Sequence, residues 1–256
     1  SVRSTRRLGS GEFGVVELGE LDGRRGSVAV KRLLDKGVDA EEQTKFLQEA
    51  RLMAFLQHEC IIKLMGVCTN EPPFLMVLEF MPGGDLRGYL KKHKTSGAAD
   101  VTNEHLTECI IRVAEAMAYL EAAHIVHRDL AARNVLVGGK LPEVKLADFG
   151  IAASIAGTAS TMTVSVLDAG TPSYMSPQQI EGRQPQATDD IYSLGATFYD
   201  LLTSKPPFYQ GDVVHQALNM EATPIEQRLK ELNLQNEVPD YVSSMVMACL
   251  QKDPGM

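Results

Sequence analysis

The stretch from His127 to Val135 constrains this chain more than any other, because it places charged groups inside an apolar region. It reads His-Arg-Asp-Leu-Ala-Ala-Arg-Asn-Val, and the apolar runs Ala122–Val126 and Val135–Val137 flank it. Charged and amide side chains between apolar runs predict a loop held on a buried core, and such loops often carry binding or catalytic residues. A charged surface turn is the alternative that the stretch alone leaves open.

The composition fits a soluble globular protein and argues against several other classes. The chain has 256 residues, of which 44% are hydrophobic and 23% charged, enough for one large domain or two lobes that share a cleft. Its net charge of −8 is the opposite of what a nucleic-acid-binding surface requires. No apolar run reaches the roughly 20 residues of a membrane-spanning helix. We therefore expect no nucleic-acid partner and no membrane contact within this segment, and the sequence indicates no oligomeric state.

The four cysteines, Cys60, Cys68, Cys109 and Cys249, show no C-x-x-C spacing. All four lie in apolar stretches, so the sequence predicts buried thiols in a reducing, cytoplasmic compartment rather than disulfides or a zinc site. The chain starts at Ser1 and not at Met. We expect it to be part of a longer protein, and the cytoplasmic side of a membrane-anchored protein is then the alternative location.

A glycine-rich pattern, G-x-G-x-x-G-x-V, runs from Gly9 to Val16. Glycines allow backbone N–H groups to approach phosphate oxygens without steric hindrance. The same pattern occurs in dinucleotide-binding turns, but those require a helix after the last glycine. Here β-favouring valines follow, and Gly23 and Gly26 precede a second strand. The pattern therefore favours a phosphate-covering hairpin.

Lys31 ends the strand that contains Val28–Val30, and a glutamate on the next helix is its candidate partner. The apolar residues of the helix predicted for 40–57 form a stripe, and Glu49 lies within it. A buried carboxylate needs a cation or takes up a proton. We therefore pair Glu49 with Lys31, although a solvated position at the edge of the stripe would suit a single glutamate equally well.

The remaining periodicity predicts a strand-rich first part and a helical second part. Met81–Gly84 breaks the pattern between them and predicts a linker, and Asp85 can cap the next helix. The predicted strands cover 61–67, 74–80, 135–137 and 144–146, and the predicted helices cover 86–92, 103–123 and 190–202. The last helix is apolar nearly all round, as expected at the centre of a lobe.

Two further segments carry polar groups. Asp148-Phe149-Gly150 follows the last predicted strand, where an aspartate is either a turn residue or a metal-binding carboxylate. Residues 151–169 are rich in Ala, Ser, Thr and Gly, a composition that predicts a mobile segment. Its hydroxyl residues are candidate phosphate acceptors: Thr158, Ser160, Thr161, Thr163 and Ser165.

These motifs, in this order, resemble a eukaryotic-type (Hanks-type) protein kinase domain, and the resemblance covers essentially the whole chain. The glycine-rich hairpin, the strand ending in Lys31, the helix glutamate, His-Arg-Asp followed by Asn134, and Asp-Phe-Gly all lie in register. The resemblance implies an α+β, bilobal fold with a β-rich N-lobe and a larger helical C-lobe, in a single domain of residues 1–256. The N-lobe would span 1–80, the hinge 81–85 and the C-lobe 86–256, ending before the last helix of the family.

By the same resemblance the chain would use ATP with Mg²⁺, for which Mn²⁺ is an alternative, and would phosphorylate a protein or peptide substrate. Lys31, pinned by Glu49, would hold the α- and β-phosphates, and Asp148 and Asn134 would bind the metal ions. Asp129 would accept or orient the proton of the acceptor hydroxyl, with Arg133 as the nearby cation. The resemblance places these residues around the nucleotide: Leu8, Gly9, Gly11, Gly14, Val16, Ala29, Lys31, Glu49, Leu78, Glu79, Met81, Asp85 and Leu136.

The resemblance also implies structural and regulatory roles. Asp190 would anchor the backbone of the catalytic loop, and Arg128 would pair with a phosphorylated residue of 151–169. His127 would belong to the core and is not expected to be catalytic. The apolar column that aligns in active kinases would consist of Met53, Leu64, His127 and Phe149.

The motifs disagree about the acceptor residue. Ser/Thr kinases usually have a lysine two residues after the catalytic aspartate, but here that position is Ala131 and the cation is Arg133, as in cytoplasmic-type tyrosine kinases. In contrast, the substrate platform Gly170–Tyr174 resembles the Ser/Thr type, in which Thr171 would hydrogen-bond the catalytic aspartate, and the following sequence looks like certain bacterial kinases. We weight the catalytic loop more heavily because it acts at the γ-phosphate. The sequence thus favours tyrosine over Ser/Thr or dual specificity.

Two other departures bear on activity. Gln178 replaces a glutamate that is usual in the family, which affects the expected stability of the C-lobe more than the chemistry. A pseudokinase that binds nucleotide as a scaffold, without phosphoryl transfer, is the alternative from another functional class. The argument against it is that five residues are intact: Lys31, Glu49, Asp129, Asn134 and Asp148.

Overall fold

The first part of the chain forms a five-stranded antiparallel sheet in the computed structural model, which describes residues 2–11, 14–23, 25–33, 40–70, 72–96, 101–150, 152–154 and 172–255. Its strands are β1 (Val2–Gly11), β2 (Gly14–Leu21), β3 (Ser27–Arg32), β4 (Leu64–Cys68) and β5 (Leu75–Glu79), in the order β1-β2-β3-β5-β4. Val28 and Val30 pack with Val77 on one face of the sheet. Because side chains alternate along a strand, Lys31 points to the opposite face.

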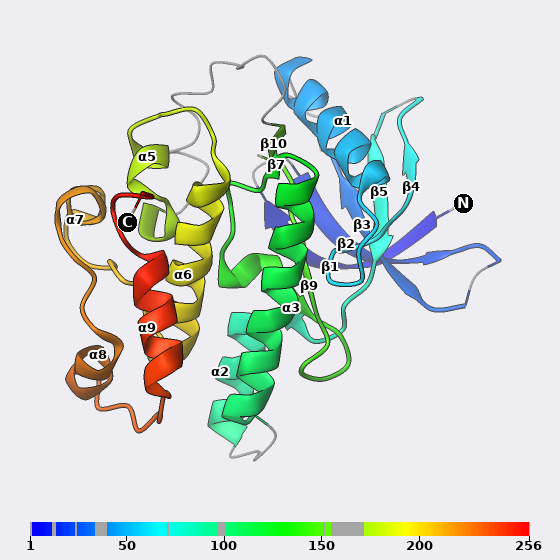
Figure 1. The fold of residues 1–256 in the computed structure, drawn as a ribbon. Coiled ribbons are helices and arrows are strands. Elements are labelled where there is room, and N and C mark those ends of the chain that lie inside the picture. Colours follow the sequence, from blue (N-terminus) through cyan, green and yellow to red (C-terminus); the bar gives the residue numbers. More distant parts are fainter. Residues whose placement is uncertain are drawn as a thin grey trace.

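One helix, α1 (Ala40–Phe55), covers that opposite face (Figure 1). Its residues Phe46 and Ala50 pack against Leu33 and Met76. Met76 lies directly opposite Lys31 in the register of β3 and β5, so Lys31 also faces the helix. Glu49 is 4% exposed and therefore lies within the buried stripe of α1, as predicted, and not at a solvated edge.

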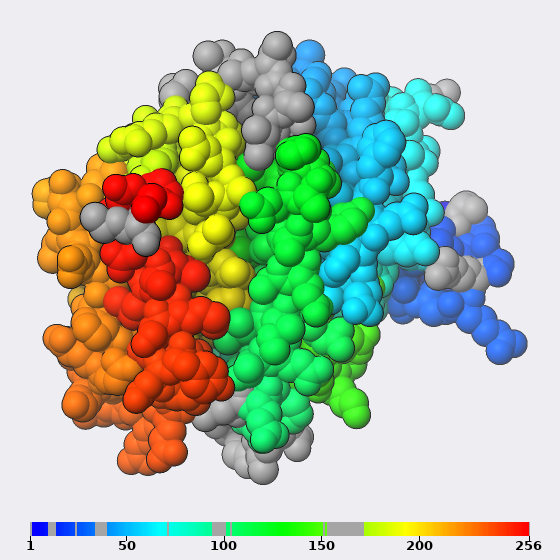
Figure 2. Space-filling model, in the orientation of Figure 1, coloured from blue at the N-terminus to red at the C-terminus, as the bar shows by residue number. Residues whose placement is uncertain are grey.

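The second part is helical and is built around α6 (Ala187–Thr203), most of whose residues are buried. The space-filling view shows α3 and α9 on the surface, with α6 between them (Figure 2). Gly195 allows α9 to approach α6 closely, because a Cβ at Gly195 would lie 2.6 Å from the Cβ of Cys249. The other helices are α2 (Leu86–Ser96), α3 (Asn103–Ala122), α5 (Pro177–Ile180), α7 (Val213–Asn219), α8 (Ile225–Glu231) and α9 (Asp240–Cys249).

Short strands hold the loop 127–134 where the two parts meet. The strands β6 (Gly84–Asp85), β8 (Val135–Val137) and β9 (Val144–Leu146) form one small sheet, and β7 (Ile125–Val126) pairs with β10 (Ala153–Ser154). The 3₁₀ turn η1 (Ala132–Asn134) ends this loop, and a second one, η2 (Pro172–Tyr174), lies against α6 and α7. The backbone of Leu146 bonds to Ile62 and Cys60, which ties the sheet-rich part to the helical part. The expected α+β, bilobal fold is confirmed, while the limits set for the two lobes stay a prediction.

Several predicted boundaries shift for local reasons. The strand predicted for 61–67 begins only at Leu64, because Ile61 and Ile62 pair with Leu146 instead of with β5. The helix predicted for 190–202 begins at Ala187, because Gln186 and Asp189 form a capping box before it. The helix after Asp85 continues past residue 92 to Ser96.

The cysteines depart from the prediction in burial. All four are free thiols, as expected. Cys60 and Cys109 are buried, but Cys68 is exposed at the end of β4 and Cys249 is only partly buried, so the prediction of four buried thiols is wrong. Cys68 ends the edge strand β4, where its apolar neighbour Val67 is also 50% exposed, so an apolar stretch of sequence is not buried at this position.

Some predictions fall outside the described residues. The candidate acceptor hydroxyls between Thr158 and Ser165 and the platform residue Thr171 are among them. In the part of the chain that the structure describes, no helix is both long and apolar enough to cross a membrane.

Candidate active site

Lys31 of β3 binds carboxylates from two different elements. Its Nζ lies 2.7 Å and 2.8 Å from the two carboxylate oxygens of Glu49 and 3.4 Å from Oδ1 of Asp148. The side chains of Lys31 and Glu49 are 11% and 3% exposed, whereas that of Asp148 is 49% exposed. The Lys31–Glu49 pair is thus buried, and Asp148 is the carboxylate of this group that a ligand can reach.

The interactions within this group keep Lys31 and Asp148 ionised. Burial lowers the pKa of Lys31, but the carboxylates of Glu49 and Asp148 raise it by more, so the pKa of Lys31 lies above its ordinary value. Burial raises the pKa of Asp148, but the ammonium of Lys31 more than offsets this, so the pKa of Asp148 lies below its ordinary value. At neutral pH, Lys31 is a cation that can meet phosphate oxygens and Asp148 an anion that can meet a metal ion.

The loop after β7 fixes the carboxylate of Asp129 from both sides. Asn134 Nδ2 donates to the backbone oxygen of Asp129 at 2.7 Å and to its Oδ2 at 2.8 Å. Arg133 Nη2 donates to Oδ1 at 2.5 Å. The turn η1 brings both partners back to Asp129, because they lie four and five residues after it. The side chain of Asp129 remains 18% exposed, so its carboxylate is held and still accessible.

Asp148 and Asn134 offer the kind of donor atoms that Mg²⁺ and Mn²⁺ prefer. The two hydrogen bonds from Nδ2 fix the amide of Asn134 and leave Oδ1 as its acceptor end. Asp148 supplies a half-exposed, ionised carboxylate. Oxygen ligands of this type, few in number, suit a metal ion that also binds substrate phosphates. These residues therefore fit the predicted metal ions.

The backbone of the same loop is anchored to α6. Asp190 accepts hydrogen bonds from the backbone N of His127 at 2.7 Å and from that of Arg128 at 2.9 Å. The fully buried ring of His127 accepts at Nδ1 from the backbone N of Asp129, so its proton is on Nε2, which faces Ala147 O at 3.2 Å. His127 is therefore a structural residue and Asp190 an anchor, as expected.

The predicted apolar column is assembled. The ring of His127 lies edge-on to that of Phe149, with centroids 4.9 Å apart. Met53 and Phe149 belong to one buried cluster, and Leu64 packs against it. The column thus runs from α1 through the sheet to the catalytic loop, which is the arrangement expected for an active kinase.

Comparison with known proteins identifies the family. A family model described as protein tyrosine and serine/threonine kinase matches residues 2–256. This chain belongs to that kinase family. The kinase domain is 34% identical over 263 residues to the high affinity nerve growth factor receptor of Gallus gallus, covering 96% of this chain and 32% of the relative.

Two other relatives differ in the acceptor that their names state. Human tyrosine-protein kinase ABL2 is 33% identical over 214 residues, covering 84% of this kinase domain and 17% of the relative. Serine/threonine-protein kinase STY46 of Arabidopsis thaliana is 33% identical over 202 residues, covering 79% and 33%. The chain spans a third or less of the length of these curated relatives.

The predicted nucleotide residues of the kinase domain lie on adjoining strands. Val16 pairs with Gly9 on one side and Lys31 on the other, and Ala29 pairs with Leu78. The other predicted contacts lie on β1, β2, the end of β5, the connection after it and the β6–β8 pair: Leu8, Gly11, Gly14, Glu79, Met81, Asp85 and Leu136. Contact of any of these residues with a nucleotide stays a prediction.

One ion pair and one buried hydrogen bond were missed by sequence reasoning. Lys145 of β9 binds both carboxylate oxygens of Glu79 at 2.9 Å, and the backbone N of Lys63 donates to the same carboxylate at 2.6 Å. In the C-lobe, Tyr174 donates to buried Asp200 at 2.8 Å. These partners lie far apart in sequence and share no periodic pattern, so only the fold brings them together.

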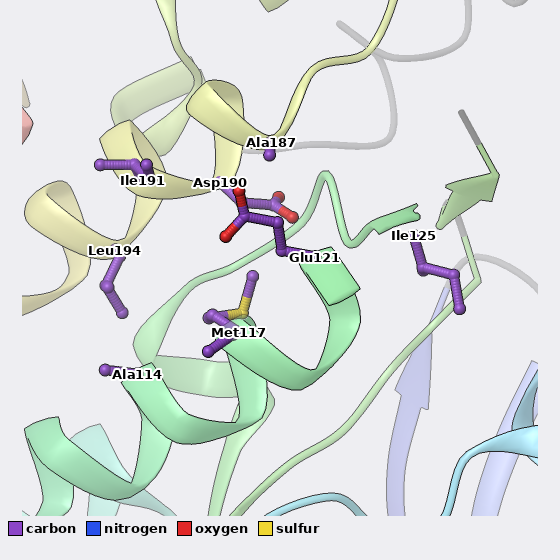
Figure 3. Close-up of a pocket in the computed structure, with 9 residues that line it drawn as sticks. Ala114, Met117, Glu121, Ile125, Ala187, Asp190, Ile191 and Leu194 are labelled. Atoms are coloured by element: carbon purple, nitrogen blue, oxygen red, sulfur yellow. The ribbon is translucent and has the colours of Figure 1, made fainter. Parts of the chain in front are cut away.

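A cavity of about 160 Å³ lies between α3 and α6, apart from the groups above (Figure 3). Its lining consists of Ala114, Met117, Ala118, Glu121, Ile125, Ala187, Asp190, Ile191 and Leu194. None of the predicted nucleotide residues is among them. The cavity is therefore not the nucleotide site, and it shares with the catalytic loop only the anchor Asp190.

Proposed function

We propose that this kinase domain transfers the γ-phosphate of ATP to a hydroxyl group of a protein or peptide substrate, with tyrosine as the favoured acceptor. The observation that carries the proposal is the assembled group of Lys31, Glu49 and Asp148, with Nζ of Lys31 2.7 Å from Glu49 and 3.4 Å from Asp148. A scaffold that only binds nucleotide does not need a buried Lys31–Glu49 pair that holds the lysine beside the half-exposed carboxylate of Asp148.

Phosphoryl transfer asks a protein mainly for positioning and charge neutralisation. Lys31 supplies a fixed cation for phosphate oxygens. Asp129, held by Asn134 and Arg133, supplies a fixed carboxylate that orients the acceptor hydroxyl and receives its proton. Asp148 and Asn134 would hold Mg²⁺, which when bound neutralises charge on the β- and γ-phosphates.

The acceptor is proposed from the catalytic loop. In this loop the cation beside the catalytic carboxylate is Arg133, and the position where Ser/Thr kinases usually carry a lysine is Ala131, which is 1% exposed. This arrangement supports tyrosine. The relatives, which carry both tyrosine and serine/threonine names, are compatible with either acceptor.

We also place the domain in the cytoplasm, or on the cytoplasmic side of a membrane protein. The four free thiols support a reducing compartment. The cytoplasm is also where a protein kinase meets ATP.

Incubation with labelled ATP and a mixed peptide library tests the proposal. Wild type is compared with Asp129→Asn, which keeps the shape of the side chain and removes its basicity. We expect wild type to label peptides and phosphoamino-acid analysis to find phosphotyrosine. Phosphoserine or phosphothreonine alone would overturn the choice of acceptor, and ATP binding without any transfer by wild type would favour a scaffold.

A further inference from the structure

Two neighbouring glutamines tie the short helix α5 to different parts of the kinase domain. Gln178 Nε2 donates to the backbone oxygen of Lys252 at 2.7 Å, and Gln179 Nε2 donates to the backbone oxygen of Arg128 at 2.7 Å. The first bond joins α5 to the chain after α9, which lies beside α5 in Figure 1. The second joins α5 to the catalytic loop, directly before Asp129.

The backbone at Arg128 needs such support. Its φ of 68° lies in the left-handed region, which residues other than glycine rarely adopt. A conformation of this kind persists only where the surroundings hold it. Asp190 holds the peptide before Arg128 by accepting from its N at 2.9 Å. Gln179 holds the peptide after Arg128, which leads straight to the Cα of Asp129.

Gln179 is itself held in place. Its side chain is buried, with the residue 6% exposed. Its backbone N donates to Ser176 Oγ at 2.9 Å, and Ser176 in turn donates to Asp189 at 2.5 Å. Asp189 precedes the loop anchor Asp190 at the start of α6. Asp190 and Gln179, the two residues that bind the backbone of Arg128, are therefore both held at the N-terminal end of α6.

The chemistry of the position requires a donor. The amide orientation of Gln179 is fixed, because exchanging its oxygen and nitrogen would set two oxygens against each other at Arg128 O. This orientation leaves Oε1 buried without a hydrogen-bond partner among the described residues. An apolar side chain here would remove this unpaired acceptor, but it would also remove the donor to Arg128 O. What the glutamine contributes is therefore the bond that holds the peptide before Asp129.

We propose that Gln179 is a positioning residue that fixes the peptide between Arg128 and Asp129 and so sets the direction of the catalytic carboxylate. The inference rests on the proposed function, since it assigns Asp129 a role in the transfer. It makes the geometry of the catalytic loop depend on where α5 lies.

Two variants test the donor, and one serves as a matched control. Gln179→Leu removes the donor with little change of size, and Gln179→Glu keeps the shape but sets a carboxylate against Arg128 O. Gln178→Leu removes a bond of the same type and length from the adjacent residue without touching the catalytic loop. For each variant, kcat, the KM values for ATP and peptide, the Kd for ATP and the Tm are measured.

We expect Gln179→Leu to lower kcat about tenfold to a hundredfold, with the Kd for ATP unchanged, because the Asp129 carboxylate is misplaced. Gln178→Leu should lower Tm and leave kcat unchanged well below Tm. Gln179→Glu should be impaired at neutral pH and recover relative to wild type as the pH falls, because the protonated acid can donate to Arg128 O. A merely structural residue would make Tm depend on pH in this way, but not kcat measured well below Tm.

Other outcomes would overturn the inference. A folded Gln179→Leu variant with wild-type kcat would show that the bond does not position Asp129. The same would follow if Gln179→Glu showed no pH-dependent recovery, or if both leucine variants lost kcat only in step with Tm. A wild type that binds ATP and transfers no phosphate would instead refute the proposed function, and the inference with it.

Discussion

Replacing Lys31 with methionine separates the catalytic role of the lysine from its role in stability. The change keeps the length of the side chain and removes the ammonium that lies 2.7 Å from Glu49 and 3.4 Å from Asp148. Glu49, 3% exposed, is then a buried carboxylate without its cation. Removing one partner of a buried ion pair costs about 3–5 kcal/mol, so the free energy of unfolding should fall by about that amount at neutral pH and above.

Protonation of Glu49 limits this loss at lower pH. Burial raises the pKa of Glu49 above its ordinary value even with Lys31 opposing it, and removing the ammonium raises the pKa further. A carboxyl group whose pKa is higher in the folded state binds its proton more tightly there, so stability returns as the pH falls through the folded-state pKa. The difference in Tm between wild type and Lys31→Met should therefore narrow as the pH is lowered from neutral.

The double variant Lys31→Met/Glu49→Leu is the control. Apolar side chains that replace a buried ion pair often restore stability. Phosphoryl transfer should not return, because the cation for the phosphates is still missing. We expect kcat/KM to stay about 10³-fold below wild type, equivalent to about 4 kcal/mol of transition-state stabilisation.

Transfer is measured with labelled ATP and a peptide substrate, and unfolding is measured with urea. Recovery of transfer in the double variant would refute the reasoning, because it would show that Lys31 acts only through the stability of the fold. A loss of stability in Lys31→Met that does not depend on pH would contradict the part assigned to Glu49.

Other positions give further tests. Burial lowers the pKa of Lys252 to about 8. Wild type should therefore gain stability as the pH rises from about 8 to about 9.5, whereas Lys252→Met should not. Urea unfolding of both proteins across this pH range tests the prediction. Gly14 has φ +152°, and an added Cβ would lie 2.1 Å from Arg32 O. Gly14→Ala should therefore distort the hairpin and raise the KM for ATP several-fold. An unchanged KM would count against the predicted role of this hairpin in ATP binding. Asp148→Asn should abolish the dependence of nucleotide affinity on Mg²⁺. ATP titrations of this variant with and without Mg²⁺ that still differ as in wild type would contradict the metal-binding role of Asp148.

The parts of the site that could be predicted carry local signals. Glu49 stands out as a carboxylate within an apolar helical stripe, and its pairing with Lys31 is found as expected. Asp190 and His127 followed from the family resemblance, and both are confirmed in structural roles. The sequence also placed α1, α3, β8 and β9 within a few residues, because the helices have an apolar period and the strands are short segments bounded by turn residues.

The parts that could not be predicted depend on contacts between distant segments. Glu79 meets Lys145 only because the fold brings the end of β5 to β9, and Gln179 meets Arg128 only because α5 lies against the catalytic loop. Nothing in the local sequence around these residues marks them as partners. The exposed thiol of Cys68 illustrates the same limit, because its burial depends on whether other segments cover the end of the edge strand β4.

Single-turnover transfer from labelled ATP to a peptide tests the central claim most directly. Wild type and Asp129→Asn are compared, with ATP affinity measured on both proteins. We predict transfer to tyrosine by wild type and a rate about 10²- to 10⁴-fold lower for Asp129→Asn at similar ATP affinity. ATP binding by wild type without transfer, or equal transfer by both proteins, would contradict the account.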